Sequence, residues 1–162
     1  MNYITNYKYT IGYIVLIVLV NVGFTVVPLV SLFGEMFPPM SLVVGLVFVA
    51  RDYAQKEIGH RVIIAMLIGA GLSYFMADPY VAIASFVAFL ISEGADWAIY
   101  TWTKKPLAQR ILISSIVSTP IDSAVFLAMI GHFSILSVVL MTLSKMIGAL
   151  VVWKMVLNRD LS

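Results

Sequence analysis

The sequence predicts an all-α membrane protein, folded as a single bundle of six transmembrane helices with both termini in the cytoplasm. Two observations on composition and pattern support this fold class. Hydrophobic residues make up 62% of the 162-residue chain and charged residues only 11%, against about 25% charged residues in ordinary soluble domains. The hydrophobic residues also fall into runs of membrane-spanning length. We therefore expect the lipid bilayer to be the medium in which this chain folds.

The apolar runs define the predicted helices. A span needs roughly 20 apolar residues to cross about 30 Å of hydrocarbon, and short breaks with proline, glycine or charged residues separate the runs. The predicted helices cover residues 10–32, 40–57, 62–77, 80–102, 107–130 and 135–157. Together they account for nearly the whole sequence, which predicts one transmembrane domain over residues 1–162.

The basic residues predict the orientation of the bundle. They lie at the amino terminus, between the second and third runs, between the fourth and fifth runs, and at the carboxyl end. These residues are Lys8, Arg51, Lys56, Arg61, Lys104, Lys105, Arg110, Lys154 and Arg159. Because basic residues mark the cytoplasmic side, both termini should be cytoplasmic. In this interpretation Arg51 belongs to the solvated end of the second helix, and Glu35 is exposed in an outer loop.

The same composition argues against several classes of function. A formal net charge of +2 is too small to predict binding of nucleic acid. The absence of cysteine excludes disulfides and thiolate catalysis. No HExxH metal motif is present, and no Ser-His-Asp set falls at a usable depth. We therefore predict no cofactor, no metal site and no enzymatic activity.

Several ionisable groups lie inside the apolar runs, where a charge near the bilayer centre costs roughly 2.5 to 3.5 kcal/mol. Such groups are expected to face the interior of the bundle. With nearby polar and aromatic side chains they form the candidate substrate-binding set: Asn21, Asp52, Glu93, Asp96, Trp97, Ser118, Asp122 and Lys145. Lys145 has two interpretations, a structural ion pair with Asp122 or Asp96 and a role in ligand or ion binding. The excess of acids over this single lysine favours hydrogen-bond acceptors for a polar ligand.

The arrangement of these residues resembles the queuosine precursor transporter family, also described as vitamin-uptake-transporter-like. The resemblance rests on Asn21, on "ARDYAQKEIGHR" around Asp52, on "ASFVAFLISEGADW" with Asp96, on "SSIVSTPIDSAVF" around Asp122, and on Lys145. These elements occur in order over nearly the whole chain. The chain departs from the family in its short loops, and Glu93 stands where some relatives carry a neutral amide.

The resemblance implies a homodimeric transporter in a prokaryotic inner membrane, with a flat, purine-like small molecule as substrate. The substrate would be 7-cyano- or 7-aminomethyl-7-deazaguanine. A carboxylate can accept hydrogen bonds from its N1–H and exocyclic amine while Lys145 donates to its carbonyl. Phe24, Phe48, Trp97 or Phe126 would stack on the ring. Glu93 would be either a second ligand contact or a group that couples uptake to protons.

Two other functions stay open from the sequence. The chain has the size and polarity expected of a substrate-binding subunit in a larger energised uptake complex. It is also compatible with a cation channel lined by Asp52, Asp96 and Asp122. Copurification with an ATPase would favour the first alternative, and ion flux without any heterocycle would favour the second.

Overall fold

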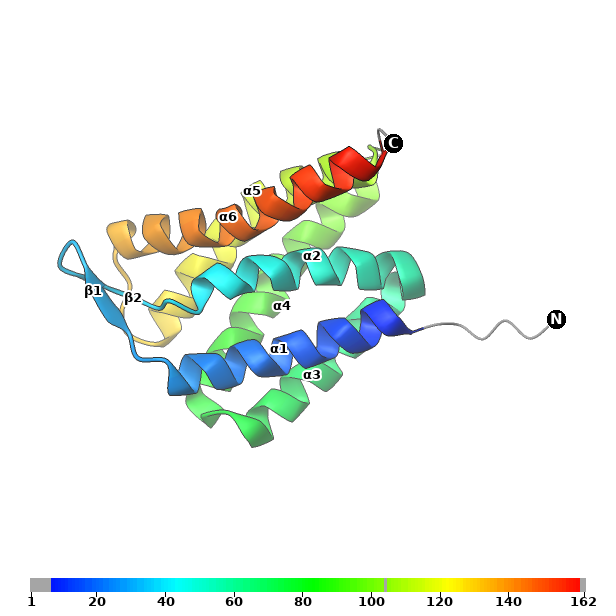
Figure 1. Cartoon of the computed structure of the whole chain (residues 1–162). Coiled ribbons are helices and arrows are strands. Elements are labelled where there is room, and N and C mark those ends of the chain that lie inside the picture. Colours follow the sequence, from blue (N-terminus) through cyan, green and yellow to red (C-terminus); the bar gives the residue numbers. More distant parts are fainter. Residues whose placement is uncertain (1–6, 104, 161–162) are drawn as a thin grey trace.

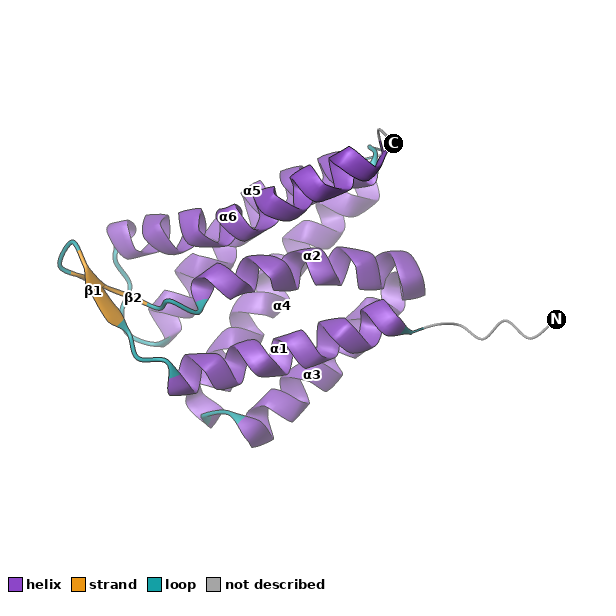
Figure 2. Cartoon of the chain, viewed as in Figure 1, coloured by secondary structure: helices purple, strands orange, loops and turns teal. Residues whose placement is uncertain are grey.

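The computed structural model describes residues 7–103 and 105–160. Its α-helices are α1 (Lys8–Val26), α2 (Ser41–Ile58), α3 (Val62–Met76), α4 (Pro79–Trp102), α5 (Leu107–Met129) and α6 (Ile135–Asp160). A 3₁₀ turn, η1 (Gly59–Arg61), joins α2 to α3. Two short strands, β1 (Val30–Leu32) and β2 (Glu35–Phe37), connect α1 to α2. The chain is thus almost entirely helical, with a small hairpin at one end (Figures 1 and 2).

The helices pack side by side into a closed ring, in the order α1, α2, α6, α5, α4, α3 and back to α1. Each helix presents one face to the centre of the ring. In α1 the buried residues include Tyr13, Ile17 and Asn21, whereas Val15 and Leu19 are exposed on the opposite face. Spacing of four residues keeps side chains on one face of a helix, so the pattern of burial follows from the helical repeat.

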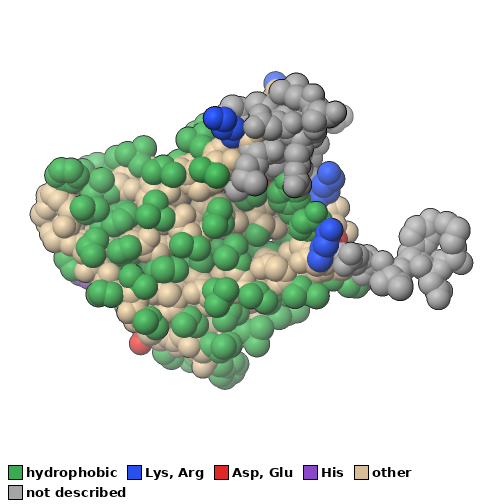
Figure 3. Space-filling model, viewed as in Figure 1, with side chains coloured by type: hydrophobic (Ala, Val, Ile, Leu, Met, Phe, Trp, Pro, Cys, Tyr) green, Lys and Arg blue, Asp and Glu red, His purple; other side chains and the backbone are tan. Residues whose placement is uncertain are grey.

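Hydrophobic side chains cover much of the visible surface (Figure 3). An apolar surface of this extent is unusual for a soluble monomer and is typical of a protein in contact with lipid. Among the described residues, four segments are long and apolar enough to cross a membrane: Lys8–Val26, Ser41–Met76, Pro79–Asp96 and Leu112–Met129. The structure therefore supports a multi-pass membrane protein.

By length and composition the described residues contain four candidate spans, not the six that the sequence predicts. Ser41–Met76 combines α2, η1 and α3, which follow one another without an intervening loop, and the apolar part of α6, Ile135–Gly148, is shorter than a full span. Figure 1 shows that the chain reverses direction at η1, so that α2 and α3 run in opposite directions.

The first predicted helix, residues 10–32, was too long at its carboxyl end. α1 ends at Val26, and residues 30–32 form β1, paired antiparallel with β2. The turn between the strands consists of Phe33 and Gly34, both with positive φ, which is the conformation that joins two strands in a tight two-residue hairpin. The hydrophobicity of "VPLVSLF" resembles that of a helix, but Pro28 and the Phe33–Gly34 turn direct the chain into a hairpin.

The prediction that Glu35 is freely exposed was also wrong. Glu35 is partly buried at the start of β2, and its Oε2 accepts a hydrogen bond of 3.2 Å from the Ser137 hydroxyl at the start of α6. This bond ties the hairpin to the bundle.

α2 and α6 come close together at two glycines, Gly45 and Gly148. A Cβ atom on Gly45 would overlap the carbonyl oxygen of Lys145 and lie 3.1 Å from the Cα of Gly148. Small residues permit close contact of helix backbones within a membrane. The contact matters for function because it fixes the turn of α6 that carries Lys145.

We expect Gly45→Ala to destabilise the bundle, because the added methyl group must push α2 and α6 apart. Overpacking of this kind costs about 1 to 3 kcal/mol. Gly71→Ala in α3 is the matched control, since nothing lies within 4 Å of a Cβ at that position and alanine is favoured over glycine in a helix by about 0.5 to 1 kcal/mol. Thermal unfolding in mild detergent should separate the two variants, and equal melting temperatures would contradict the close approach.

Candidate functional site

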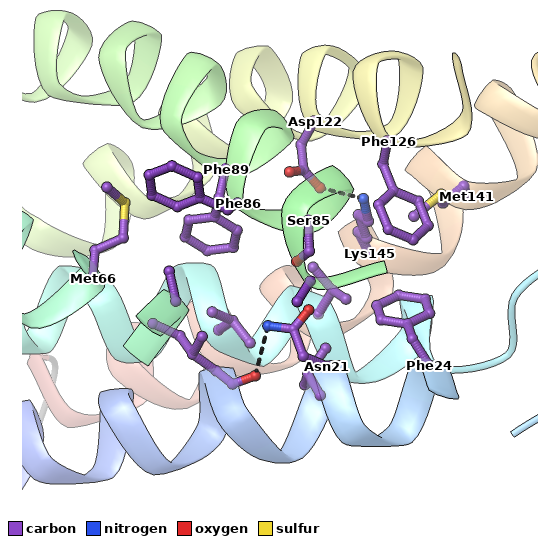
Figure 4. Close-up of a pocket in the computed structure, with 16 residues that line it drawn as sticks. Asn21, Phe24, Met66, Ser85, Phe86, Phe89, Asp122, Phe126, Met141 and Lys145 are labelled. Carbon is purple, nitrogen blue, oxygen red and sulfur yellow. Dashed lines mark hydrogen bonds and ion pairs between the residues drawn. The ribbon is translucent and has the colours of Figure 1, made fainter. Parts of the chain in front are cut away.

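The centre of the helix ring encloses a cavity to which every helix from α1 to α6 contributes (Figure 4). Its polar wall consists of Asn21 on α1, Ser85 on α4, Asp122 on α5 and Lys145 on α6. Phenylalanine and aliphatic side chains form the remainder. A cavity that is mainly apolar with a few convergent polar groups is the usual form of a small-molecule binding site.

Asp122 and Lys145 form a buried ion pair in the wall of this cavity, with the ammonium of Lys145 donating to Asp122 Oδ2. Figure 4 shows the two side chains directed toward each other from α5 and α6. The exposed fractions of their side chains are 5% for Asp122 and 0% for Lys145. The pair places a strong acceptor directly beside a strong donor, and this geometry can recognise a ligand that carries a donor beside an acceptor.

Asn21 provides an acceptor on the other side of the cavity. Its amide nitrogen donates to the Ile17 carbonyl and to the Ser73 hydroxyl, each at 3.1 Å. Ser73 donates in turn to the Gly69 carbonyl, so the amide is held in a defined orientation. The oxygen, Asn21 Oδ1, is buried and has no hydrogen-bond partner. A buried acceptor without a partner costs about 1 to 3 kcal/mol, and a ligand donor in the cavity would remove this cost.

Aromatic rings line both ends of the cavity. Phe24 on α1 and Phe126 on α5 lie with their ring centroids 5.0 Å apart, and Phe86 and Phe89 line it from α4. Phe89 also stacks on Phe48 of α2 at 5.4 Å. These rings offer flat apolar faces to a flat ligand.

The cavity is narrow in this conformation. The centres of water molecules could occupy about 30 Å³ of it, which is room for about two waters. A bicyclic ring needs more space, so its entry requires the surrounding helices to move apart. The structure therefore represents a closed form of the cavity.

A second group of charges lies one helical turn further along α2 and α4, around Arg51. The Arg51 guanidinium donates from Nε to Glu93 Oε2 at 2.6 Å, and from Nη1 to Asp52 Oδ1 at 2.9 Å and to Asp96 Oδ2. Only 1% of the Arg51 side chain is exposed. The prediction that Arg51 belongs to the solvated end of its helix was therefore wrong. We call Arg51, Asp52, Glu93 and Asp96 the arginine cluster.

Sequence reasoning missed Arg51 because hydropathy does not distinguish a basic residue at a helix end from one that turns inward. The structure explains the inward direction by the spacing along α2. Arg51 follows Val47, which lines the central cavity, by four residues, and residues four apart share a helix face. Arg51 binds Glu93 and Asp96, and Lys145 binds Asp122.

The structure thus divides the predicted site residues between two places. Asn21, Asp122 and Lys145 line the central cavity, whereas Asp52, Glu93 and Asp96 belong to the arginine cluster. Ser118 is buried, does not line the cavity, and donates its hydroxyl to the Ser114 carbonyl within α5. The side chain of Trp97 lies outside the described part of the structure.

A ring of apolar helices around a partly polar cavity is typical of a membrane protein that binds a small molecule. Over residues 7–159 the chain matches the family described as "Putative vitamin uptake transporter". The chain belongs to that family, which supports transport and favours a non-enzymatic role. No curated protein and no solved structure matches the chain.

We expect Asp122→Asn and Lys145→Met each to reduce folded protein strongly, because either change leaves one buried charge without its partner. Loss of one member of a buried pair costs about 3 to 5 kcal/mol. The double variant removes both charges and should recover much of that loss. Melting temperature and the monodisperse fraction after detergent extraction would measure it.

Two matched controls apply to these variants. Lys154→Met removes an exposed lysine from the same helix, α6. Asp78→Asn changes an exposed residue whose carboxylate caps α4 by accepting from the backbone N–H groups of Tyr80 and Val81, and asparagine caps a helix equally well. Both should melt like the parent. Additive losses in the Asp122→Asn/Lys145→Met variant would show that the two charges do not stabilise each other.

Proposed function

We propose that this chain is a secondary transporter that imports a queuosine precursor, 7-cyano- or 7-aminomethyl-7-deazaguanine, across the inner membrane of a prokaryotic cell. The observation that carries the proposal is the Asp122–Lys145 pair beside aromatic rings in a cavity enclosed by the whole helix ring. Membership of the vitamin uptake family supports transport. The resemblance of the polar sequence elements supports the identity of the substrate.

The chemistry of the pair suits the edge of a guanine-type base. That edge presents a carbonyl acceptor beside an N1–H donor, followed by an amine donor. Lys145 can donate to the carbonyl while Asp122 accepts from the adjacent N–H. The buried oxygen of Asn21, which has no protein partner, can accept a further N–H from the bicyclic ring. Phe24 and Phe126 would then face the ring system.

The charge of the cavity suits the neutral 7-cyano form better than the 7-aminomethyl form, whose primary amine is protonated near neutral pH. Asp122 and Lys145 neutralise each other, so the cavity has no net charge to balance that of an ionic ligand. A substrate that inserts its donor and acceptor beside the pair leaves both charges hydrogen-bonded. This arrangement avoids the large cost of separating two ions in an apolar medium.

The orientation that we propose places both termini in the cytoplasm, with six crossings of the membrane. The first residue of α1 and the last residue of α6 lie at the same end of the bundle (Figure 1). The Lys and Arg side chains visible in Figure 3 also gather toward that end, as expected for the cytoplasmic side. Assembly as a homodimer stays a prediction from the family resemblance.

We expect a reporter fused after Ser162 to be active when it requires the cytoplasm and silent when it requires the periplasm. The reason is the concentration of basic residues at the end of the bundle where α6 finishes. A second fusion within the Phe33–Gly34 turn should give the opposite result, since the hairpin lies at the other end (Figure 1). Periplasmic activity of the fusion after Ser162 would overturn the orientation.

We expect purified protein in liposomes to take up labelled 7-cyano- or 7-aminomethyl-7-deazaguanine, and excess unlabelled precursor to compete. Phe126→Leu preserves much of the side-chain volume but removes the ring, and should weaken apparent affinity about two- to tenfold, the equivalent of about 0.5 to 1.5 kcal/mol. Phe133→Leu, at an exposed position in the α5–α6 connection, is the matched control and should transport normally.

Two results of this experiment would count against the proposal. Absence of uptake by folded, correctly inserted protein would reject a secondary transporter of these bases, and uptake that required an added ATPase would favour a binding subunit. Equal affinity of Phe126→Leu and Phe133→Leu would remove the central cavity from the binding site.

A further inference from the structure

The arginine cluster contains more negative than positive charge. Three carboxylates, of Asp52, Glu93 and Asp96, surround the single guanidinium of Arg51. Among these, Glu93 and Asp96 both come from α4 and share the guanidinium of Arg51, so with all three ionised they carry −2 against +1. Every member is buried. Two ionised carboxylates that share one buried cation are costly, so a proton on one of them would lower that cost.

Within the arginine cluster, Glu93 has a carboxylate oxygen that can bind a proton. Its Oε2 accepts from Arg51, whereas its Oε1 is buried and has no hydrogen-bond partner. The Glu93 residue is 6% exposed. Tyr13 on α1 lies within electrostatic range of Glu93, and its hydroxyl is also buried without a partner.

A proton fits this site better than a metal ion. Arg51 already occupies the position where the carboxylates converge, and it would repel a second cation. Among the described residues, no group of three His, Cys, Asp or Glu side chains is arranged to hold a metal ion. A proton on Glu93 Oε1 needs no further ligands, and it converts a partnerless acceptor into a hydroxyl donor.

The arginine cluster lies next to the central cavity, so a proton bound there can affect how that cavity is closed. Arg51 lies one turn beyond Val47, and Glu93 one turn beyond Phe89, both of which line that cavity. α2 and α4 are not neighbours in the helix ring, so Arg51 joins them across its interior. The cluster lies toward the η1 end of the ring, the end that we propose to be cytoplasmic.

A separate side cavity reaches the cluster between α3 and α4. It is lined by Arg51, Glu93 and Gly94 together with apolar residues of both helices. Met66 lines both this cavity and the central one. Among the described side chains, the charged or titratable groups that face Glu93 are Tyr13 from α1, Arg51 and Asp52 from α2, and Asp96 from α4. From α3, the residues beside it in the side cavity, Val62, Ile63 and Met66, are apolar.

We propose that Glu93 is a proton-binding site, and that its protonation releases the clamp by which Arg51 closes the η1 end of the central cavity. A proton from water bonds to Oε1 and the carboxylate becomes a carboxylic acid. The charge-assisted bond from Arg51 to Glu93 then becomes a weaker bond to a neutral group. α2 and α4 are free to separate at that end, and the cavity opens toward the proposed cytoplasmic side.

The experiment uses the absence of native cysteine. Val47→Cys places one thiol at the closed end of the central cavity, and Phe133→Cys places one at an exposed position as a reference. A water-soluble maleimide is applied to each protein in membranes from mildly alkaline to mildly acidic pH. The thiolate reacts with maleimide and its fraction falls with acidification. Thiol chemistry alone therefore predicts slower labelling at low pH for both variants.

For the thiol in the central cavity we expect the opposite change, faster labelling as the pH falls. Relative to Phe133→Cys, labelling of Val47→Cys should rise about tenfold for each unit fall in pH while Glu93 is mostly ionised, because the protonated fraction rises tenfold. Adding Glu93→Gln, which mimics the protonated form, should make labelling fast throughout. Glu35→Gln, which retains an acceptor for Ser137, is the matched control and should leave the pH dependence intact.

A normalised labelling rate that does not change with pH in the Val47→Cys protein would overturn the proposal, whether or not Glu93→Gln folds. Unchanged pH dependence in a folded Glu93→Gln variant would overturn the assignment to Glu93. The role of the proton rests on the proposed transport function, but this measurement uses no deazaguanine. Failed deazaguanine uptake with intact pH-dependent labelling would therefore reject the substrate and leave the proton site standing.

Discussion

The need to neutralise ionised groups inside an apolar helix ring is the constraint on which this structure depends. Lipid surrounds the ring and offers no hydrogen bonds, so each buried charge must find its partner within the ring. Asp122 and Lys145 satisfy this requirement as a pair between α5 and α6. Arg51 satisfies it by joining α2 to two carboxylates of α4. The ionic contacts thus join α5 to α6 and α2 to α4 in the interior of the ring.

The two ionic groups differ in a way that suits different tasks. The Asp122–Lys145 pair is formally neutral and lies in the wall of a cavity with aromatic sides, an environment suited to a neutral flat molecule. In the arginine cluster two carboxylates of α4 share the guanidinium of Arg51, which joins α2 to α4 across the ring; within the described residues the backbones of these two helices are not in contact. We therefore assign substrate binding to the central cavity, and closure of that cavity to the arginine cluster one helical turn away.

Close packing of backbones supports this arrangement. Gly45 brings α2 against the carbonyl of Lys145, and the hydroxyl of Ser41, one turn earlier, donates to Ser144 at 3.1 Å. These contacts hold α6 against α2 while α6 extends Lys145 toward α5. On α5, Ser118 and Ser123 donate to backbone carbonyls of their own helix, so the many hydroxyl groups of that helix contribute little polarity to the cavity.

The sequence by itself determined that the chain is an α-helical membrane protein, because apolar runs and intervening breaks are local properties that hydropathy reports directly. It also identified Asn21, Asp122 and Lys145 as interior groups, since a polar residue within a span has few other places to go. Only the tertiary structure decided how the charges pair. Lys145 had two carboxylates as candidate partners, and the choice depends on the order of helices around the ring, which no local pattern encodes. The inward direction of Arg51 was decided in the same way, by its contacts with α4, which lies far away in the sequence. The hairpin at residues 30–37 instead follows from Pro28 and the Phe33–Gly34 turn, which hydropathy does not detect.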